Sequence, residues 1–250
     1  MAVVDKNVND REIMVVGVDS SHVKGQRIGV AMVASINQNY TDFFNKESLI
    51  KEEKKEELSF CVSSFLEEAN TAYLKENKKA QKNIIIYRQG VSLQQKEFLK
   101  AEIKQIDQVW KNKNILYYYI LVNTKTTYKF FEKAGNKYNN PGAGLLIMGG
   151  ITNKNFFEFY IQPQEVTGGS ATPTCFHVAY GNMNCPEMIP KLTYDLCHIY
   201  SNYQGVIKLP NAIKNAEKLS KTTVNNINEL NKKFQIGQAY LWTIFNFSTL

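Results

Sequence analysis

The sequence predicts an α/β fold in which sheet strands are covered by helices, and we expect one domain spanning residues 1–250. Apolar runs of strand length alternate with longer segments of helical periodicity along most of the chain, which is typical of sheet strands covered by helices. Only a short turn separates the first two apolar runs, so the sheet opens with a hairpin. Hydrophobic residues make up 44% of the 250 residues and charged residues 21%, which suits a globular chain with a sizeable core.

Apolar spacing and turn signals place the elements of the first half. Residues 13–18 predict a strand that ends at Asp19, and residues 28–36 predict its hairpin partner. After a charged stretch at 46–57, apolar residues three and four apart predict a helix. Its buried face comprises Leu58, Val62, Phe65, Leu66, Ala69 and Tyr73. This half is completed by a strand at 83–87, a turn at 88–90, a helix over 93–110 and a buried strand over 115–122.

The second half has shorter predicted elements and a basic end. Strands are expected at 144–151, 156–161 and 175–180, and a helix at 191–200 begins just after Pro190, where a helix tolerates proline. The segment from Lys208 to Lys233 contains six lysines and two glutamates, a charge of +4. Much of the net charge of the chain is therefore concentrated there.

Composition and charge narrow the class of protein. Thirty Lys and Arg against 23 Asp and Glu give a net charge of +7, which makes a polyanionic partner plausible. Four cysteines without a C-x-x-C pair are too few for a disulfide scaffold. The N-terminus lacks the pattern of a signal peptide, and the longest apolar stretch is shorter than the roughly 18–20 residues of a membrane span. We expect a cytoplasmic or nuclear protein with no membrane partner.

Seven segments, in the same order along the chain, resemble one family. They are MVVGVDSSH (14–22), GVAMVASIN (29–37), IIIYRQGVS (84–92), NPGAG (140–144), FFEFYIQPQ (156–164), ATPTCFHVAY (171–180) and LTYDLCHIYSNYQGVIKLP (192–210). Together they resemble the PIWI domain of Argonaute/Piwi proteins, the small-RNA-guided silencing family, and its Piwi branch in particular. The resemblance implies a ribonuclease-H-like mixed sheet flanked by helices, which agrees with the fold read from the apolar pattern.

The resemblance also implies partners and further domains. Its partners would be a small guide RNA, a complementary target RNA and silencing proteins. Family members carry N-terminal, PAZ and MID domains ahead of this one, and we expect them to be absent from this chain because few residues precede Ile13. Whether the chain is a fragment or a stand-alone PIWI-like protein stays open.

The resemblance carries a catalytic tetrad to four positions. In slicing members Asp, Glu, Asp and His hold a pair of Mg²⁺ ions, which need hard oxygen ligands. Asp19 matches the first ligand, and Glu57 is the best match to the second, 32 residues before position 89. The third position is Gln89 in place of Asp, and the fourth is Glu217 in place of His. Mg²⁺, with Asp19 as a possible ligand, is the one cofactor expected.

The two replacements predict a binding module that does not cut. A neutral amide is a weaker metal ligand than a carboxylate, and Glu217 lies on a different element from Gln89. The leading hypothesis is a domain that holds guide RNA and the guide–target duplex, with RNA contacts from Arg88, Gln94, Gln95, Lys208, Lys214, Lys218 and Lys221. The alternatives are a Mg²⁺-dependent endoribonuclease with altered ligands and a protein-docking scaffold that has lost RNA.

Other conspicuous residues have structural explanations. His177 and His198 stand inside strand and helix patterns, so we expect structural roles for them. Cys175, His177 and Cys185 lack a fourth zinc ligand at a suitable spacing. The run Tyr117 to Tyr119 could stack bases but is expected in the core.

Overall fold

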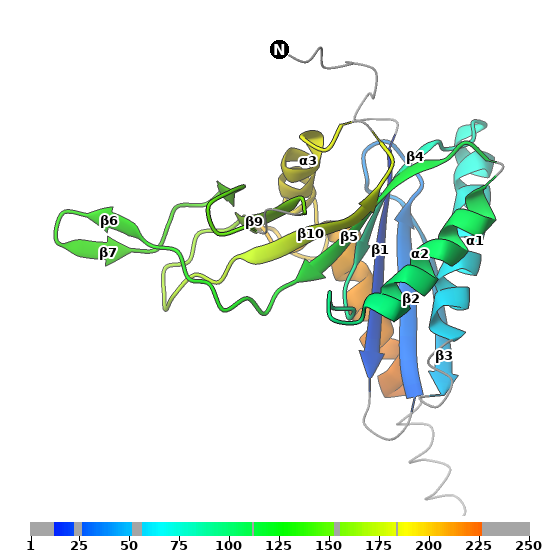
Figure 1. Cartoon of the computed structure of the whole chain (residues 1–250), viewed down its shortest axis with the longest axis horizontal. Coiled ribbons are helices and arrows are strands. Elements are labelled where there is room, and N and C mark those ends of the chain that lie inside the picture. The colour runs from blue at the N-terminus through cyan, green and yellow to red at the C-terminus, as the bar shows by residue number, and fades with distance from the viewer. Residues whose placement is uncertain are drawn as a thin grey trace, which may run out of the picture.

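The computed structural model describes residues 13–22, 27–51, 57–111, 113–152, 156–183 and 185–226. Within them, eight strands form one mixed sheet (Figure 1). Its strands, in spatial order, are β3 (Phe43–Lys51), β2 (Arg27–Ser35), β1 (Ile13–His22), β4 (Asn83–Arg88), β5 (Leu116–Asn123), β10 (Thr174–Gly181), β9 (Glu158–Gln162) and β8 (Leu145–Ile147). A separate two-stranded sheet pairs β6 (Glu132–Ala134) with β7 (Lys137–Asn139).

The centre of the sheet is parallel and its flanks are antiparallel. β1 pairs with β4, and β4 with β5, in parallel, whereas all other pairs are antiparallel. The predicted hairpin is confirmed, because β1 and β2 run antiparallel. β1 continues past Val18, its last residue paired with β4, and so extends beyond Arg88 at the end of β4. The carboxyl ends of the three parallel strands thus meet at one edge, where side chains from all three can gather.

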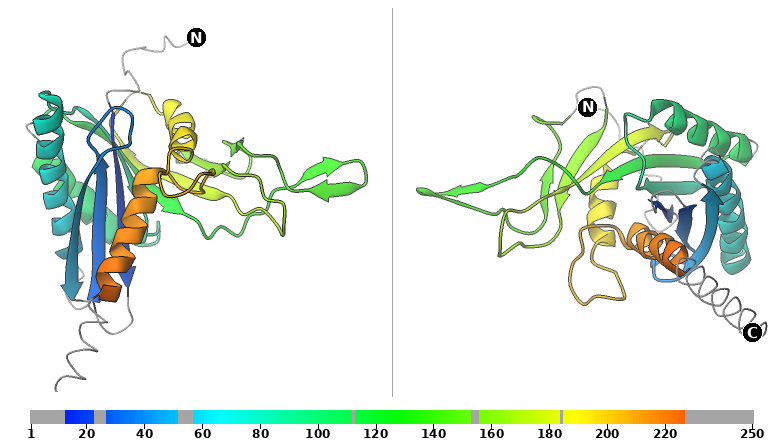
Figure 2. Two further views of the ribbon diagram at one scale, coloured as in Figure 1. Left: turned by 180° about the vertical axis from the view of Figure 1, so that it is seen from behind. Right: turned by 90° about the horizontal axis from the view of Figure 1, so that it is seen from below.

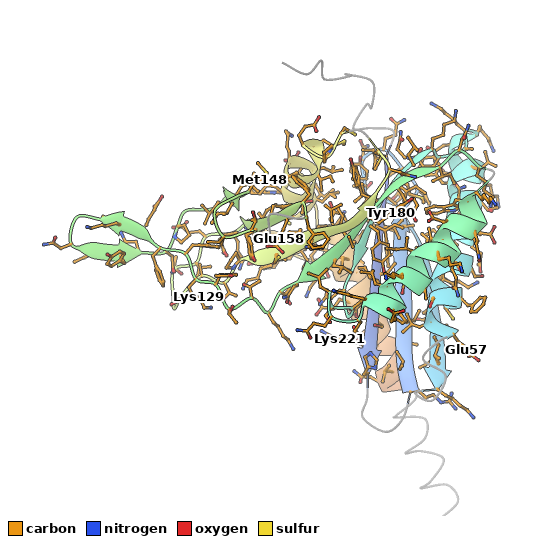
Figure 3. The ribbon with its side chains drawn as sticks, viewed as in Figure 1. Glu57, Lys129, Met148, Glu158, Tyr180 and Lys221 are labelled. Atoms are coloured by element: carbon orange, nitrogen blue, oxygen red, sulfur yellow. The ribbon has the colours of Figure 1, made fainter. Side chains whose placement is uncertain are left out.

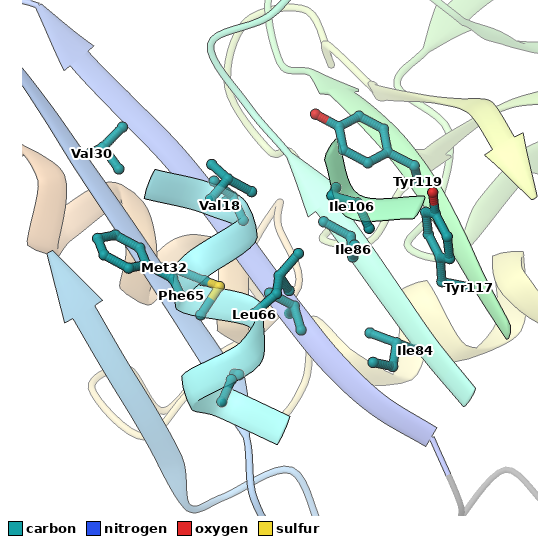
Figure 4. Close-up of a cluster of buried hydrophobic side chains, with 14 of the residues drawn as sticks. Val18, Val30, Met32, Phe65, Leu66, Ile84, Ile86, Ile106, Tyr117 and Tyr119 are labelled. Atoms are coloured by element: carbon teal, nitrogen blue, oxygen red, sulfur yellow. The ribbon is translucent and has the colours of Figure 1, made fainter. Parts of the chain in front are cut away.

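Helices cover both faces of the sheet. α1 (Glu57–Asn77) and α2 (Lys96–Trp110) lie on one face, and α3 (Met188–Leu196) and a helix over 211–226 lie on the other (Figure 2). Alternate residues of β1 serve the two layers, as the period of two requires. Met14 and Val16 join the cluster beneath α1 and α2, which Figure 4 shows, and Ile13 and Val15 join the cluster beneath α3 and the 211–226 helix.

Three elements were not predicted from the sequence. They are β3, the β6–β7 hairpin and the helix over 211–226. The predicted strand over 144–151 is confirmed only for the three residues of β8. Tyr117, Tyr118 and Tyr119 are all buried, as expected. Within the described part of the chain, no helix is both long and apolar enough to cross a membrane.

Candidate functional site

A cleft of about 790 Å³ opens at the carboxyl edge of the parallel strands. Four parts of the chain line it: β1 near Asp19, the segment 89–95 after β4, the segment 121–128 at the end of β5, and the 211–226 helix. β9 and β10 close the far end through Glu158, Tyr160, Cys175 and His177. The cleft therefore brings together residues from both halves of the sequence.

Asp19 is buried in the cleft and bound by hydroxyl groups. Ser220 Oγ donates to Asp19 Oδ2 at 2.5 Å, and Ser21 Oγ donates to the same oxygen at 3.4 Å. The two serine oxygens lie 2.8 Å apart. Two neutral hydroxyl donors therefore stabilise this carboxylate.

Glu217 lies on the 211–226 helix and is bridged by two lysines. Lys221 Nζ lies 2.5 Å from Glu217 Oε1, and Lys214 Nζ lies 2.9 Å from Oε2. Burial raises the pKa of Glu217, but hydrogen bonds and attraction from Lys221 and Lys214 outweigh burial and leave that pKa below its ordinary value. The carboxylate is therefore ionised at neutral pH, and its charge is balanced locally.

Gln89 reaches the cleft from the turn that follows β4. Its backbone N–H donates to Val18 O at 2.9 Å, which ties the turn to β1. Gly90 follows with φ of +85°, a left-handed conformation that favours glycine. The side-chain Oε1 of Gln89 is buried and accepts no hydrogen bond from the described residues. The amide oxygen is thus an unsatisfied acceptor in the cleft.

The position of Arg88 contradicts the sequence-based expectation that this residue contacts RNA. Its side chain is fully buried, and its Nε lies 3.1 Å from Glu102 Oε1 on α2. Tyr119 Oη donates to the same glutamate oxygen at 2.6 Å, and Arg88 Nη1 donates to Gln89 O at 2.5 Å. Burial lowers the pKa of Arg88, but Glu102 more than offsets it and keeps the guanidinium charged. Arg88 therefore holds the backbone of Gln89 from within the core, and none of its donors is exposed to a ligand.

Glu57 does not join the other three tetrad positions. It is the first residue of α1, is exposed, and lies outside the cleft lining, away from Lys221 (Figure 3). The structure brings Asp19, Gln89 and Glu217 into one cleft and leaves Glu57 apart from them. Glutamates 52, 53 and 56, which the sequence offers as neighbours of Glu57, lie outside the described residues.

The packing of the 211–226 helix on β1 brings Glu217 and Ser220 to Asp19. A Cβ on Gly17 would lie 2.3 Å from Ile213 N and 2.4 Å from Ala212 C. Because only glycine permits so close an approach, the helix backbone rests directly on the strand. Residues one and two helical turns further on then reach the cleft.

The other predicted RNA contacts are distributed unevenly. Gln94, Gln95 and Lys221 line the cleft. Gln95 Oε1 accepts from Ser92 N at 3.0 Å, so this amide closes its own turn. Lys208 and Lys218 are exposed outside the cleft lining, and Lys214 is committed to Glu217.

The far end of the cleft carries groups that sequence analysis assigned to the fold. His177 Nδ1 lies 3.4 Å from Glu158 Oε2, and burial lowers the pKa of His177 despite the opposing effect of Glu158. Burial raises the pKa of the Cys175 thiol to about 12, so this thiol is no nucleophile at neutral pH. His198 Nδ1 lies 2.9 Å from Tyr194 O near the end of α3. Both histidines have structural contacts.

Few oxygen ligands for a pair of Mg²⁺ ions gather among the described residues of the cleft. Such a centre needs several oxygen ligands converging on each ion. Within the described ranges, no three His, Cys, Asp or Glu side chains gather as a metal site. Asp19 is bound by serines, Gln89 is neutral, and Glu217 has two ammonium partners. The negative charge of Glu217 is thus offset by two lysines, whereas the side-chain contacts of Asp19 are with serine hydroxyls.

Ser21 and Ser220 contact Asp19 and were not predicted as site residues. Each is polar and unremarkable alone, and 199 positions separate them. A usable signal existed on the later helix, where Ala212, Ala216, Ser220 and Val224 recur every four residues as its buried face. That spacing puts Ser220 on the side that packs against the sheet.

Comparison with known proteins assigns the family. The Piwi domain model matches residues 1–228. Piwi-like protein 1 of Danio rerio is 33% identical over 220 residues, which cover 84% of this chain and 25% of that protein. The crystal structure of Drosophila Piwi matches with a TM-score of 0.71 at 26% identity, covering 84% of this chain and 29% of that one.

A third match extends the likeness in fold. The crystal structure of Kluyveromyces polysporus Argonaute with a guide RNA has a TM-score of 0.73 at 21% identity, over 84% of this chain and 26% of that one. This chain spans about a quarter of the length of these relatives. The ribonuclease-H-like mixed sheet expected from the resemblance is confirmed by these neighbours. With a family model that matches nearly its whole length, the chain belongs to the Piwi domain family, that of the Argonaute and Piwi proteins.

Proposed function

We propose that this chain holds a small guide RNA paired with its target RNA in the cleft and does not cleave the target. The observation that carries the proposal is the ion cluster of Lys214, Glu217 and Lys221 beside Asp19. Two-metal cleavage of a phosphodiester relies on anionic ligands that concentrate divalent cations. In this chain, the ammonium groups of Lys214 and Lys221 lie beside one such carboxylate, that of Glu217.

The same cluster favours binding of a phosphate backbone without metal. A cleft lined by three carboxylates without positive partners would repel a phosphodiester unless divalent cations were bound between them. Because two lysines are paired with the single carboxylate of Glu217, this cluster has a net positive charge, which weakens that repulsion. Lys221 lines the cleft with a side chain 58% exposed, so its ammonium can reach a phosphate oxygen as well as Glu217.

Further support comes from the surroundings of the cleft. Gln94 and Gln95 line it, and Lys208 and Lys218 are exposed on the basic segment that also contains Lys221. Phosphate contacts of this kind fix a duplex without reading its sequence, which base pairing with the guide supplies. The Argonaute of Kluyveromyces polysporus, which has the same fold, was solved with a guide RNA.

Silencing by such a module depends on other proteins. Without cleavage, the bound target must be repressed by partners recruited to the complex, in the cytoplasm or the nucleus. The N-terminal, PAZ and MID domains of the family would supply the remaining guide contacts, either in trans or from a longer chain.

The test is binding and cleavage of a labelled guide–target RNA duplex, each measured in Mg²⁺ and in EDTA. We expect equal affinity in both conditions and no cleavage product in Mg²⁺. Lys221→Met should weaken binding several-fold, whereas Lys75→Met, on the exposed surface of α1, should not.

Two other results would replace the proposal. Cleavage that requires Mg²⁺ and disappears in Asp19→Asn would establish an endoribonuclease with altered ligands. Absence of RNA binding at low salt would leave the protein-docking scaffold.

A further inference from the structure

The β6–β7 hairpin stands away from the rest of the molecule. We call residues 131–139 the arm; it forms its own two-stranded sheet and projects from the body in Figure 1 and in both views of Figure 2. Every residue of β6 and β7 is exposed. The arm therefore adds no core to the domain, and its side chains are available to a partner.

The arm carries two exposed aromatic rings, Phe131 and Tyr138. Lys133 lies directly opposite Tyr138, and residues opposite one another in an antiparallel pair point to the same face. Phe131 immediately precedes β6 in the chain, two residues before Lys133. Phe131 is 51% exposed and Tyr138 is 69% exposed, and neither ring packs on another among the described residues. Aromatic rings with this much exposed surface are available to stack on the bases of a nucleic acid.

The arm and the segment leading into it are basic. Lysines recur every four residues, at positions 125, 129, 133 and 137, against a single acid, Glu132. In the described part of the chain, no carboxylate forms an ion pair with Lys125, Lys133 or Lys137. Aromatic rings among uncompensated lysines suit a polyanion with stackable bases better than an apolar protein surface.

The base of the arm is fixed beside the cleft. The rings of Tyr128 and Phe130 pack edge-on against Tyr160, with centroids 5.6 Å and 6.0 Å away. Tyr128 and Tyr160 both line the cleft. Lys129, at the base of the arm in Figure 3, donates a hydrogen bond to Thr172 Oγ1. The lining of the cleft thus continues along the chain into the arm.

We infer that the arm binds a single-stranded segment of RNA that leaves the duplex held in the cleft. Phe131 and Tyr138 stack on unpaired bases, and Lys133 and Lys137 contact the phosphates. Bases within a duplex already stack on one another, so the arm distinguishes unpaired from paired RNA. The inference rests on the proposed function, because the duplex in the cleft is what delivers the strand to the arm.

The test compares three RNA probes: a blunt duplex, the same duplex with single-stranded extensions at both ends, and the extension strand alone. Binding of each to the whole chain is measured by fluorescence anisotropy. The wild type should bind the extended duplex about tenfold more tightly than the blunt one, the gain typical of stacking one base. Phe131→Ser with Tyr138→Ser should abolish this preference and leave affinity for the blunt duplex unchanged.

Phe60→Ser provides the matched control, since Phe60 is 67% exposed on α1 and far from the cleft lining. It should keep the tenfold preference. A preference that survives in the arm variant overturns the inference and leaves a protein as the partner of the arm. If the extension strand alone bound in an arm-dependent way and the blunt duplex did not bind, the result would support RNA binding by the arm. It would also contradict the proposed function of the cleft. No binding of any probe would overturn both.

Discussion

Glu217 links the charge balance of the cleft to pH. Its pKa in the folded protein lies below the ordinary value of 4.5, because Lys221 and Lys214 outweigh the effect of burial. A depressed pKa stabilises the fold at pH above the unfolded value, and that contribution is lost as pH falls through the folded value. We predict that the wild type loses more unfolding free energy between pH 7 and pH 3.5 than Glu217→Gln does.

Urea denaturation at the two pH values measures this difference. Glu76→Gln serves as the control, because Glu76 is exposed on α1 and has no ion pair within the described ranges. Equal losses for the wild type and Glu217→Gln would show that the lysines do not stabilise the carboxylate.

A substitution at Gln89 can make the stability of the fold depend on Mg²⁺. Its Oε1 is buried and unpartnered, and β1 and β4 place the residue after Val18 beside the residue after Arg88. Gln89→Asp adds a second carboxylate next to Asp19, and two like charges in a partly buried site repel. We predict a lower melting temperature in EDTA that Mg²⁺ restores, measured by thermal denaturation. The wild type and Gln89→Leu should show no such response to Mg²⁺, and a response in Gln89→Leu would refute the explanation.

The Arg88–Glu102 ion pair supports the cleft from the core. Both side chains are fully buried, so removing one partner leaves an unpaired charge inside the protein. Glu102→Gln should lower the unfolding free energy by about 3–5 kcal/mol. Tyr119→Phe removes only one hydrogen bond to Glu102 and should cost about 1 kcal/mol. Chemical denaturation of both variants distinguishes the two, and similar small losses would mean that the pair is dispensable.

At the scale of elements, the helix over 211–226 depends on Gly17 for its position. Gly17→Val would bring side-chain atoms onto the helix backbone at Ala212 and Ile213, so the helix must move off β1. Since this helix carries Glu217 and Ser220 to Asp19, we predict a loss of stability of several kcal/mol and of RNA binding together. Gly168→Ala, whose Cβ would meet nothing within 4 Å, should change neither. Retained RNA binding in Gly17→Val would show that the helix does not build the cleft.

The sequence predicts elements well where apolar residues are periodic and less well elsewhere. The β1–β2 hairpin, α1, β4, α2 and β5 follow from their apolar patterns. β3 is an edge strand in which Asn45, Lys46 and Glu47 interrupt any apolar run, so its charge suggested a loop. β6 and β7 bury nothing and leave no hydrophobic signal. In the 211–226 helix, the buried face consists mainly of small residues, and the lysines between them made the segment look like an exposed basic stretch.

At the scale of the whole molecule, the candidate site was only partly accessible to sequence reasoning. Asp19, Gln89 and Glu217 came from a resemblance, and the structure brings them into one cleft. The residues that contact these three could not be predicted in this way. Ser220, for example, binds Asp19 although 201 positions of sequence separate them. Arg88 was misassigned for the same reason: burial on Glu102 depends on how α2 packs, which no local pattern records.

The net charge of +7 makes salt the most informative variable for the whole molecule. Each phosphate contact releases counterions, so the logarithm of the binding constant should fall linearly with the logarithm of salt concentration. Replacing Lys218 and Lys221 together by Met should reduce the magnitude of that slope by about two, one for each phosphate contact. The proposed phosphate contacts come from lysines and not from metal ions, so the slope should be the same in Mg²⁺-free buffer with EDTA. Lys75→Met lowers the net charge of α1, on the other side of the sheet from the 211–226 helix, and should leave the slope unchanged. If it reduced the slope as much as replacing Lys218 or Lys221 did, binding would reflect the overall charge of the protein and not a site.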